Sequence, residues 1–207
     1  MVIEIIILVF VLFFSIILHE CAHGWTAYKL GDPTAKLMGR LTFNPIKHVD
    51  PYGTLLVPGI LIALRLLGYG TFVFGWAKPV PVNFARLHHP KRDMIWVGLS
   101  GPLSNIIVAV AASQLLKISI IPAVSQILEF AVFFNLLLAI FNLIPIPPLD
   151  GSRVVMGILP NRYAFPYSRL ERYGILIVIG LLYFGLFDNV VIPTIDFCGK
   201  LLGVYFQ

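Results

Sequence analysis

Charged residues are scarce in this chain. Asp, Glu, Lys and Arg make up 12% of its 207 residues, whereas they make up about a quarter of a typical soluble domain. Hydrophobic residues make up 58%, and the mean hydropathy is +0.90. This composition excludes an ordinary soluble domain and predicts a polytopic α-helical membrane protein. At roughly 20 residues for each crossing, the chain has room for at most about six crossings.

Cysteine is also scarce. The two cysteines, Cys21 and Cys198, are too few for a disulfide framework. The net charge of +5 is modest, and Lys and Arg lie mostly beside apolar segments, as topology determinants do. This distribution does not favour nucleic-acid binding. There is no room for a separate soluble domain, so we expect a single membrane domain over residues 1–207.

Six apolar segments are the candidate helices. The first, third and fourth are long enough to span a bilayer, whereas the fifth and sixth are shorter. A Pro58-Gly59 pair interrupts the second, and Asp196 and Lys200 make the sixth amphipathic. The sequence therefore predicts about five spanning helices, with the second segment as the exception. The six segments are 2–24, 53–70, 94–116, 123–146, 173–187 and 190–206.

The distribution of positive charge predicts the topology. Of the 15 Lys and Arg residues, nine lie between Lys29 and Arg92 and four lie between the fourth and fifth segments. Cytoplasmic stretches carry the excess of Lys and Arg. The basic stretches on both sides of segment 53–70 can be cytoplasmic only if this segment makes no net crossing. We therefore predict a re-entrant hairpin that bends at Pro58-Gly59.

The residues that flank this hairpin predict extended chain. Residues 36–43 favour a strand, residues 71–76 are aromatic and β-branched, and the prolines in residues 78–83 exclude a helix. The sequence thus predicts a small membrane-associated β-sheet between the first and third helices. Its edge could pair with an unwound substrate strand, or the sheet could be a structural cap. The sequence does not decide between these two roles.

The motif H-E-x-x-H, from His19 to His23, directly follows the first apolar run. Residues four apart lie on one face of a helix, so the two imidazoles can bind the same ion. Glu20 lies about 100° round the helix from His19, close enough to act on a water bound to that ion. Zinc would lower the pKa of the water, and Glu20 would take its proton. Ionisable groups at membrane depth indicate a functional site, which favours this interpretation over two hydrogen-bonded core histidines.

A catalytic zinc site needs a third protein ligand and an open position. Asp150 is the best candidate, because three prolines break the helix just before it. Freed backbone at membrane depth is tolerated only when it is buried in protein or lines a wet cavity. The alternative is an ordinary turn at Asp150-Gly151. His48 and Asp50 are rival ligands, or partners of a ligand imidazole.

Two asparagines lie within the apolar segments. Asn142 lies two turns before Asp150 and could pair with another helix or bind the substrate backbone. Both roles stay open. Asn105 could bond across to the helix of the motif, but with Gly101 and Ser104 it is expected mainly to support helix packing.

Together these residues resemble the site-2 protease family of intramembrane zinc metalloproteases. The resemblance includes H-E-x-x-H at 19–23, Ser-Gly-Pro at 100–102 and N-x-x-P-x-x-x-L-D-G at 142–151. Residues 75–83 further resemble the small prokaryotic branch. The resemblance covers about residues 1–160, which would form the catalytic core, followed by C-terminal helices at about 173–207.

The resemblance implies that His19, His23 and Asp150 bind one zinc ion per chain. It implies that Glu20 is the general base and that Asn142 helps to hold the substrate. The expected activity is endopeptidase cleavage of a transmembrane protein substrate in the lipid bilayer of a prokaryotic cell (inner) membrane. Because His23 precedes the basic stretch by a few residues, we expect the site to lie towards the cytoplasmic side.

Two other functions stay open. A divalent-metal transporter would also place His and Asp in the membrane, but transporters often contain internal repeats and this sequence shows none. A non-catalytic membrane-protein-binding member of the same fold would typically lack the Glu or a metal ligand. This chain has all four residues, and we therefore favour the protease.

Overall fold

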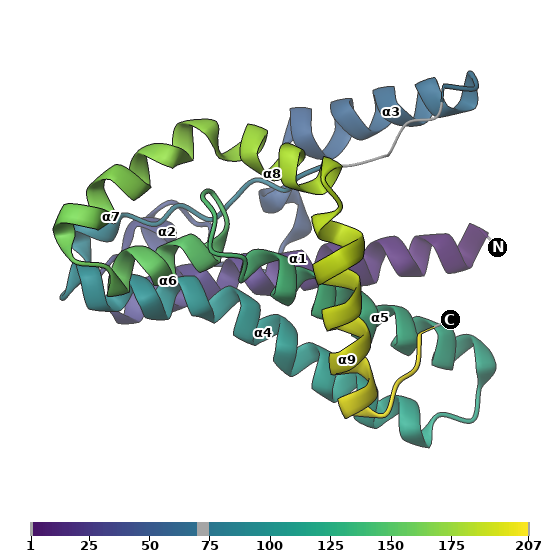
Figure 1. The fold of residues 1–207 in the computed structure, drawn as a ribbon. Helices are drawn as coiled ribbons and strands as arrows, with labels where there is room; N and C mark the ends of the chain where they lie inside the picture. Colours follow the sequence, from purple (N-terminus) through teal and green to yellow (C-terminus); the bar gives the residue numbers. More distant parts are fainter. Residues whose placement is uncertain (1, 70–74, 207) are drawn as a thin grey trace.

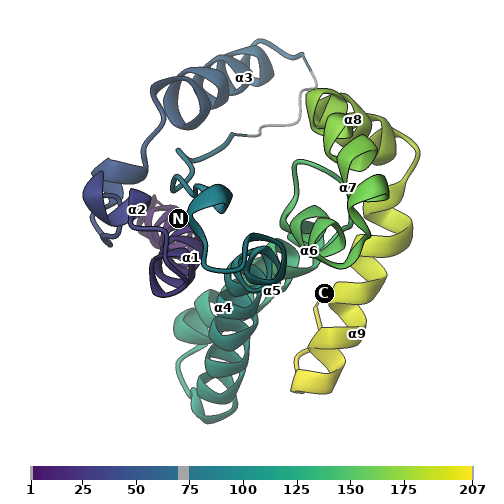
Figure 2. The ribbon, with the colours of Figure 1, turned by 90° about the vertical axis from the view of Figure 1, so that its left-hand side faces the viewer.

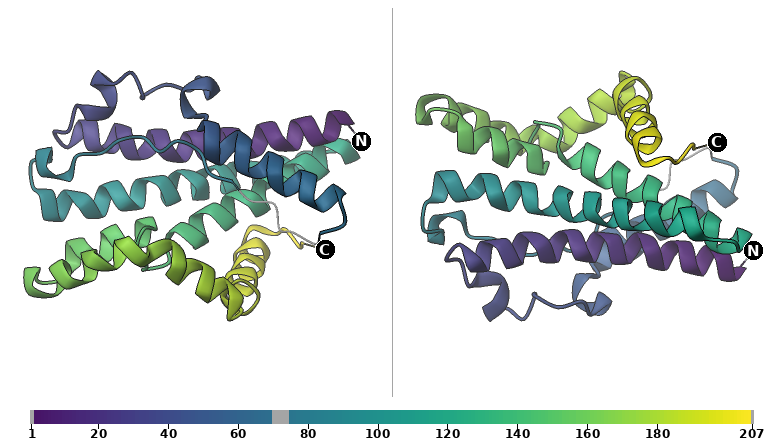
Figure 3. Two further views of the ribbon diagram at one scale, coloured as in Figure 1. Left: turned by 90° about the horizontal axis from the view of Figure 1, so that it is seen from above. Right: turned by 90° about the horizontal axis from the view of Figure 1, so that it is seen from below.

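The computed structural model describes residues 2–69 and 75–206. Three of its helices are long and apolar enough to cross a membrane. Helix α4 packs against both α1 and α5 and brings the three together (Figures 1 and 3). This arrangement confirms a helical protein with several membrane-capable segments. The three helices are α1 (Val2–Lys29), α4 (Pro90–Ile118) and α5 (Pro122–Asn142).

The C-terminal helices are not confirmed as two separate spans. The segments Asn161–Tyr183 and Phe187–Leu202 pass the test for a span only as a pair, and they are bent by 70°. The described residues therefore hold three helices that could span a membrane, or four if the bent pair is one span, and the expected five are not confirmed. The pair comprises α7 (Asn161–Ser168), η4 (Arg169–Tyr173), α8 (Gly174–Tyr183), η5 (Phe187–Val191) and α9 (Ile192–Leu202).

The second apolar segment is one short helix. A π-helical turn, η2 (Pro51–Leu56), continues into α3 (Val57–Leu66). The predicted bend at Pro58-Gly59 is wrong, because Pro58 lies in the first turn of α3, where a proline is tolerated. The helix instead continues to Leu66, and the turn that ends it contains Gly68, which has a φ of +88°.

The chain then returns beside its starting point. The backbone N–H of Trp76 donates to the carbonyl of Gly53 at 3.1 Å, and that of Lys78 donates to the carbonyl of His48 at 2.9 Å. Residues 75–83, called the returning chain below, have no regular secondary structure, as their prolines predict. Figure 2 shows this stretch on the inner side of a ring formed by the helices. A helix followed by a chain that comes back beside the start of that helix is compatible with a hairpin that makes no net crossing.

The predicted β-sheet is not confirmed. None of the residues that the structure describes is in a strand. Lys36 and Leu37 end a short helix, α2 (Thr34–Leu37), and a turn follows in which Gly39 has a φ of +63°. The predicted strand at 36–43 is therefore wrong, because the chain reverses where it should extend. Residues 71–74 of the second predicted strand lie outside the described residues.

Small side chains bring the helices into close contact. The main buried cluster lies between α4, α5 and the C-terminal pair, and alanines at its centre let the helices approach. Large apolar side chains such as Phe10 and Ile107 are exposed on the outer faces, as lipid-facing residues are. The polar site therefore lies inside a bundle with an apolar exterior. The main cluster contains Ala109, Ala112, Ala131, Val132, Leu136, Val191, Ile195 and Val204.

Candidate active site

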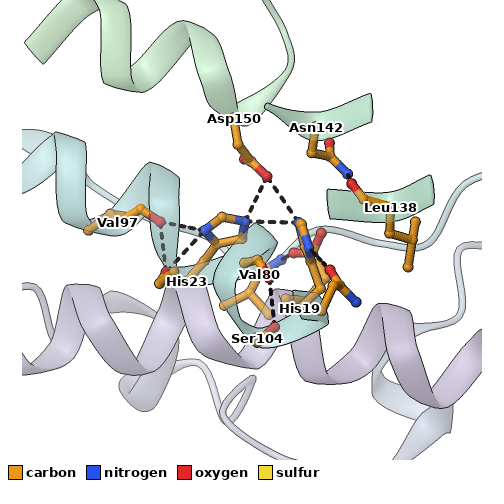
Figure 4. Close-up of polar contacts among 12 residues, drawn as sticks. His19, His23, Val80, Val97, Ser104, Leu138, Asn142 and Asp150 are labelled. Atoms are coloured by element: carbon orange, nitrogen blue, oxygen red, sulfur yellow. Dashed lines mark hydrogen bonds and ion pairs between the residues drawn. The ribbon is translucent and has the colours of Figure 1, made fainter. Parts of the chain in front are cut away.

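Three residues come together in the C-terminal half of α1, although one of them is distant in sequence. His19 and His23 lie one turn apart on α1, and Asp150 is the first residue of α6 (Asp150–Ile158). The Nε2 atoms of the two histidines are 3.0 Å apart, and Asp150 Oδ2 lies 3.0 Å from His19 Nε2 and 3.1 Å from His23 Nε2. Figure 4 shows the three groups pointing at one another. Both histidines are buried.

This triangle fits a zinc ion. Ligand atoms about 2.0 Å from a tetrahedral zinc lie roughly 3.3 Å from one another, close to the three separations in this site. Two imidazoles and a carboxylate are also common zinc ligands. In the part of the chain that the structure describes, this is the one group of His, Cys, Asp and Glu that could hold a metal ion.

Asp150 reaches the histidines because the chain breaks after α5. Residues 143–149 are irregular, and they turn the chain back so that α6 begins beside α4. Gly151 makes this turn possible, because a Cβ there would lie 2.2 Å from the carbonyl oxygen of Leu143. Tyr167 donates a hydrogen bond of 2.7 Å to the carbonyl of Pro145 and supports the turn. The predicted helix break is confirmed, and the role of Asp150 as a ligand stays a prediction.

The rival ligands have structural partners elsewhere. His48 is fully buried, and its Nε2 lies 2.8 Å from the carbonyl oxygen of Thr42. Asp50 accepts hydrogen bonds from the backbone N–H groups of Tyr52 and Gly53 and caps η2. Neither side chain joins the group of possible ligands. Their environment indicates that both support the loop between α1 and α3.

Each histidine has a partner at its second nitrogen. His23 Nδ1 lies 2.7 Å from the carbonyl oxygen of Val97, and His19 Nδ1 lies 2.6 Å from Asn105 Oδ1. Since a carbonyl oxygen only accepts, His23 carries its proton on Nδ1 and leaves Nε2 free for a metal. Metal-binding histidines usually have such a partner. Asn105 was expected mainly to support helix packing, and no pattern in the sequence indicates Val97, because a backbone carbonyl has no sequence signature.

Glu20 is held by the returning chain. Its Oε2 accepts a 2.7 Å hydrogen bond from the backbone N–H of Val80. It shares one pocket with both histidines and Asp150. Glu20 is therefore beside the possible metal site without being part of the ligand triangle, as the motif predicts.

Buried and charged groups fix the returning chain. Arg40 donates to the carbonyl oxygens of Lys78 and Pro79 at 2.8 and 3.2 Å. Asp32 accepts a 2.6 Å bond from the backbone N–H of Asn83. Burial acts to raise the pKa of the Asp32 carboxyl, but its hydrogen bonds from Thr34 and Asn83 outweigh this and lower the pKa. The charged carboxylate thus anchors one wall of the site near neutral pH.

The pocket has a volume of about 320 Å³. Apolar side chains of the returning chain line it together with Asn142 and Arg153, and the Arg153 guanidinium lies over the Phe84 ring, 5.3 Å from its centre. Asn142 donates a 2.9 Å hydrogen bond to the carbonyl of Leu138 in its own helix. The structure therefore brings all five predicted site residues into one pocket. The lining residues are His19, Glu20, His23, Pro79, Val80, Val82, Phe84, Val97, Gly98, Asn142, Pro148, Asp150 and Arg153.

Helix α4 passes so close to the histidines that only glycine fits at position 101. A Cβ there would lie 2.3 Å from His23 Nε2 and 2.7 Å from His19 Cε1. Replacing Gly101 by Ala should therefore displace an imidazole and weaken zinc binding. We expect the affinity to fall by at least about tenfold, which is the lower end of the losses seen when residues around metal ligands are changed. Gly180→Ala is the matched control, because a Cβ at this position in α8 meets nothing within 4 Å. Competition with a chromophoric chelator measures the affinity, and equal affinities for both variants would contradict this prediction.

Comparisons with known proteins identify relatives of the chain. A family model described as "Peptidase family M50" matches residues 113–185. The protein "Putative zinc metalloprotease YwhC" of Bacillus subtilis is 37% identical, and the match covers 97% of this chain and 92% of the relative. No solved structure matches the chain significantly.

Two more distant relatives have related names. "Putative zinc metalloprotease Rip2" of Mycolicibacterium smegmatis is 30% identical over 81% of this chain and 63% of its own length. "Zinc metalloprotease MJ0392" of Methanocaldococcus jannaschii is 25% identical over 97% of this chain and 48% of its own length. Because the match with the Bacillus protein extends over nearly all of both chains, this chain belongs to peptidase family M50, the site-2 protease family of zinc metalloproteases.

Proposed function

We propose that this protein is an intramembrane zinc endopeptidase that cleaves a peptide bond within or near a transmembrane segment of a substrate protein. The observation that carries the proposal is the buried triangle of His19, His23 and Asp150, with Glu20 in the same pocket. The triangle includes two residues of a helix that is apolar enough to span a bilayer. A hydrolytic site in that position acts on polypeptides in the membrane.

In this proposal His19, His23 and Asp150 hold one zinc ion. When bound, zinc polarises the scissile carbonyl and lowers the pKa of water. Glu20 takes a proton from the attacking water as the new C–O bond forms, and it delivers a proton to the leaving nitrogen as the C–N bond breaks. The hydrogen bond from Val80 holds the Glu20 carboxylate in place for both transfers.

The substrate must unwind before it is cut, since a helical peptide bond is shielded by its own turn. Pro79, Val80 and Val82 line the pocket, so an unwound substrate chain bound there would lie against their side chains and beside Glu20. Asn142 lies in the same pocket, where its carboxamide helps to hold the substrate chain. These assignments explain why an irregular, proline-rich segment is anchored so firmly beside the metal site.

We place the site towards the cytoplasmic side of a prokaryotic cell membrane. The support is the concentration of Lys and Arg just after α1 and between α5 and α8, because cytoplasmic stretches carry this excess. Water would reach the pocket from that side. Asp32 and Arg40, which anchor the returning chain, would then lie on the cytoplasmic side of the site.

The proposal is tested by cleavage of a fluorescent transmembrane reporter in vesicles that contain the purified protein. We expect cleavage that a zinc chelator abolishes and that added zinc restores. His23→Ala should lose activity by at least about 10³-fold, since it removes a metal ligand, whereas His89→Ala changes an exposed histidine and should leave activity intact. Cleavage that persists with the chelator would contradict the proposal. Zinc uptake by the vesicles without cleavage would favour a transporter.

A further inference from the structure

A chain of buried polar side chains connects three spanning helices to His19. It consists of Ser15 on α1, Asn105 on α4 and Asn135 on α5, with exposed fractions of 2%, 0% and 0%. Asn105 lies between His19 and Asn135, with its Oδ1 2.6 Å from His19 Nδ1 and its Nδ2 2.9 Å from Asn135 Oδ1. Buried amides in a membrane bundle are expected to have hydrogen-bond partners. In this cluster the donor and the acceptor of each hydrogen bond can be assigned.

The assignment of donors and acceptors starts at a backbone carbonyl. The carbonyl oxygen of Ala131 can only accept, so Asn135 must turn its Nδ2 towards it, at 2.8 Å. The same Nδ2 donates to Ser15 Oγ at 2.9 Å. Asn135 Oδ1 is therefore left to face α4. A carboxamide has one oxygen, so Asn105 must present its Nδ2 to Asn135 and its Oδ1 to His19.

The result is a defined tautomer of His19. Because Asn105 Oδ1 accepts, His19 Nδ1 must carry the proton and donate. In a neutral imidazole the other nitrogen, Nε2, then has a free lone pair. That nitrogen is the one beside His23 and Asp150.

We propose that Asn105 and Asn135 form a relay that sets the tautomer of His19 for metal binding. Asn135 is then a positioning residue for the zinc site, although it lies on a helix that supplies no proposed ligand. The relay rests on the proposed role of His19 as a ligand. It also explains why two amides are buried side by side in an apolar bundle, where two leucines would fill similar space.

The test compares Leu and Asp at both positions. Asn105→Leu and Asn135→Leu keep the approximate size and remove the polar groups, and we expect zinc affinity to fall about 10- to 100-fold and about 3- to 30-fold, respectively. Asn105→Asp and Asn135→Asp should stay within about threefold of the original protein, because a neutral carboxylic acid still offers one acceptor and one donor, although it lacks the second N–H that Asn135 donates to Ser15. A purely structural role predicts the reverse order, since Leu suits an apolar bundle better than Asp.

Chelator competition in detergent gives the affinities, and thermal unfolding of the zinc-free variants shows whether they fold. Ser113→Ala is the matched control, because Ser113 is also fully buried on α4 but donates to the carbonyl of Val110 in its own helix. It should bind zinc normally. Leu variants that fold and bind zinc as tightly as the original protein would overturn the relay. So would Leu and Asp variants that lose zinc equally.

A direct measurement does not depend on the variants. Nitrogen NMR of the zinc-free, histidine-labelled protein, at a pH where imidazole is neutral, should show His19 protonated at Nδ1 and not at Nε2. His19→Ala assigns the signal. The opposite tautomer would overturn the relay. If the original protein bound no zinc at all, the proposed function would fail instead, so the two failures are distinguishable.

Discussion

Replacing Glu20 by Gln is expected to abolish peptide cleavage and to leave zinc bound. Gln has the same shape, and its carbonyl oxygen can still accept the hydrogen bond that Val80 donates to Glu20. An amide cannot take a proton from water near neutral pH, so general-base catalysis is lost. Such catalysis contributes about 10²- to 10⁴-fold, and we expect the turnover number to fall by at least about 100-fold.

Two measurements on the same preparation check this result. Turnover of the transmembrane reporter should fall, whereas zinc content per chain should match that of the original protein. Glu129→Gln is the matched control, because Glu129 lies on α5 among the residues of a second pocket, away from the histidines. It should keep full activity. Retention of more than about a tenth of the turnover in Glu20→Gln would refute the role of Glu20 as the base.

Replacing Asp150 by Ala should remove zinc from the purified protein. The original chain is expected to contain about one zinc ion, and the variant should contain almost none. Asp150 Oδ2 lies within 3.1 Å of both imidazole Nε2 atoms, so its loss removes one corner of the ligand triangle. Changes outside the ligands cost about 10- to 100-fold in affinity, and the loss of a ligand should cost at least about 100-fold.

Metal analysis of the protein in detergent gives the zinc content. Asp188→Ala is a matched control, because Asp188 is an exposed acid in η5 and should not change zinc content. A variant at position 150 that keeps its zinc would mean that the third ligand lies elsewhere. His48 and Asp50 would then be the first residues to examine, although in this structure both have other partners.

Several features of the site could be read from local sequence. The spacing of His19 and His23 requires only a helix, since residues four apart share a face. The break before Asp150 follows from prolines, which cannot continue a helix. Both signals act over a few residues and do not depend on the rest of the fold, and the structure has both features.

Other predictions, which concern the conformation of whole segments, were wrong or are not confirmed. Pro58 was expected to bend the second segment, but it lies in the first turn of α3, and the chain turns only beyond Leu66. The strand expected at 36–43 is a helical turn and a reversal. The fifth and sixth apolar segments, expected to span separately, form one pair bent by 70°, and two separate spans are not confirmed. For Pro58 the deciding feature is where the helix begins, because a proline is tolerated in a first turn.

By itself, the sequence determined that this is a membrane protein with a helical H-E-x-x-H motif and a proline-broken helix ahead of Asp150. Those properties follow from hydropathy, helix periodicity and proline geometry, which are local. Only the tertiary structure decided that Asp150 meets the two histidines, that Val80 holds Glu20 and that Asn135 faces Asn105. These contacts join residues 30 to 131 positions apart, and their distances depend on how helices pack rather than on any short pattern.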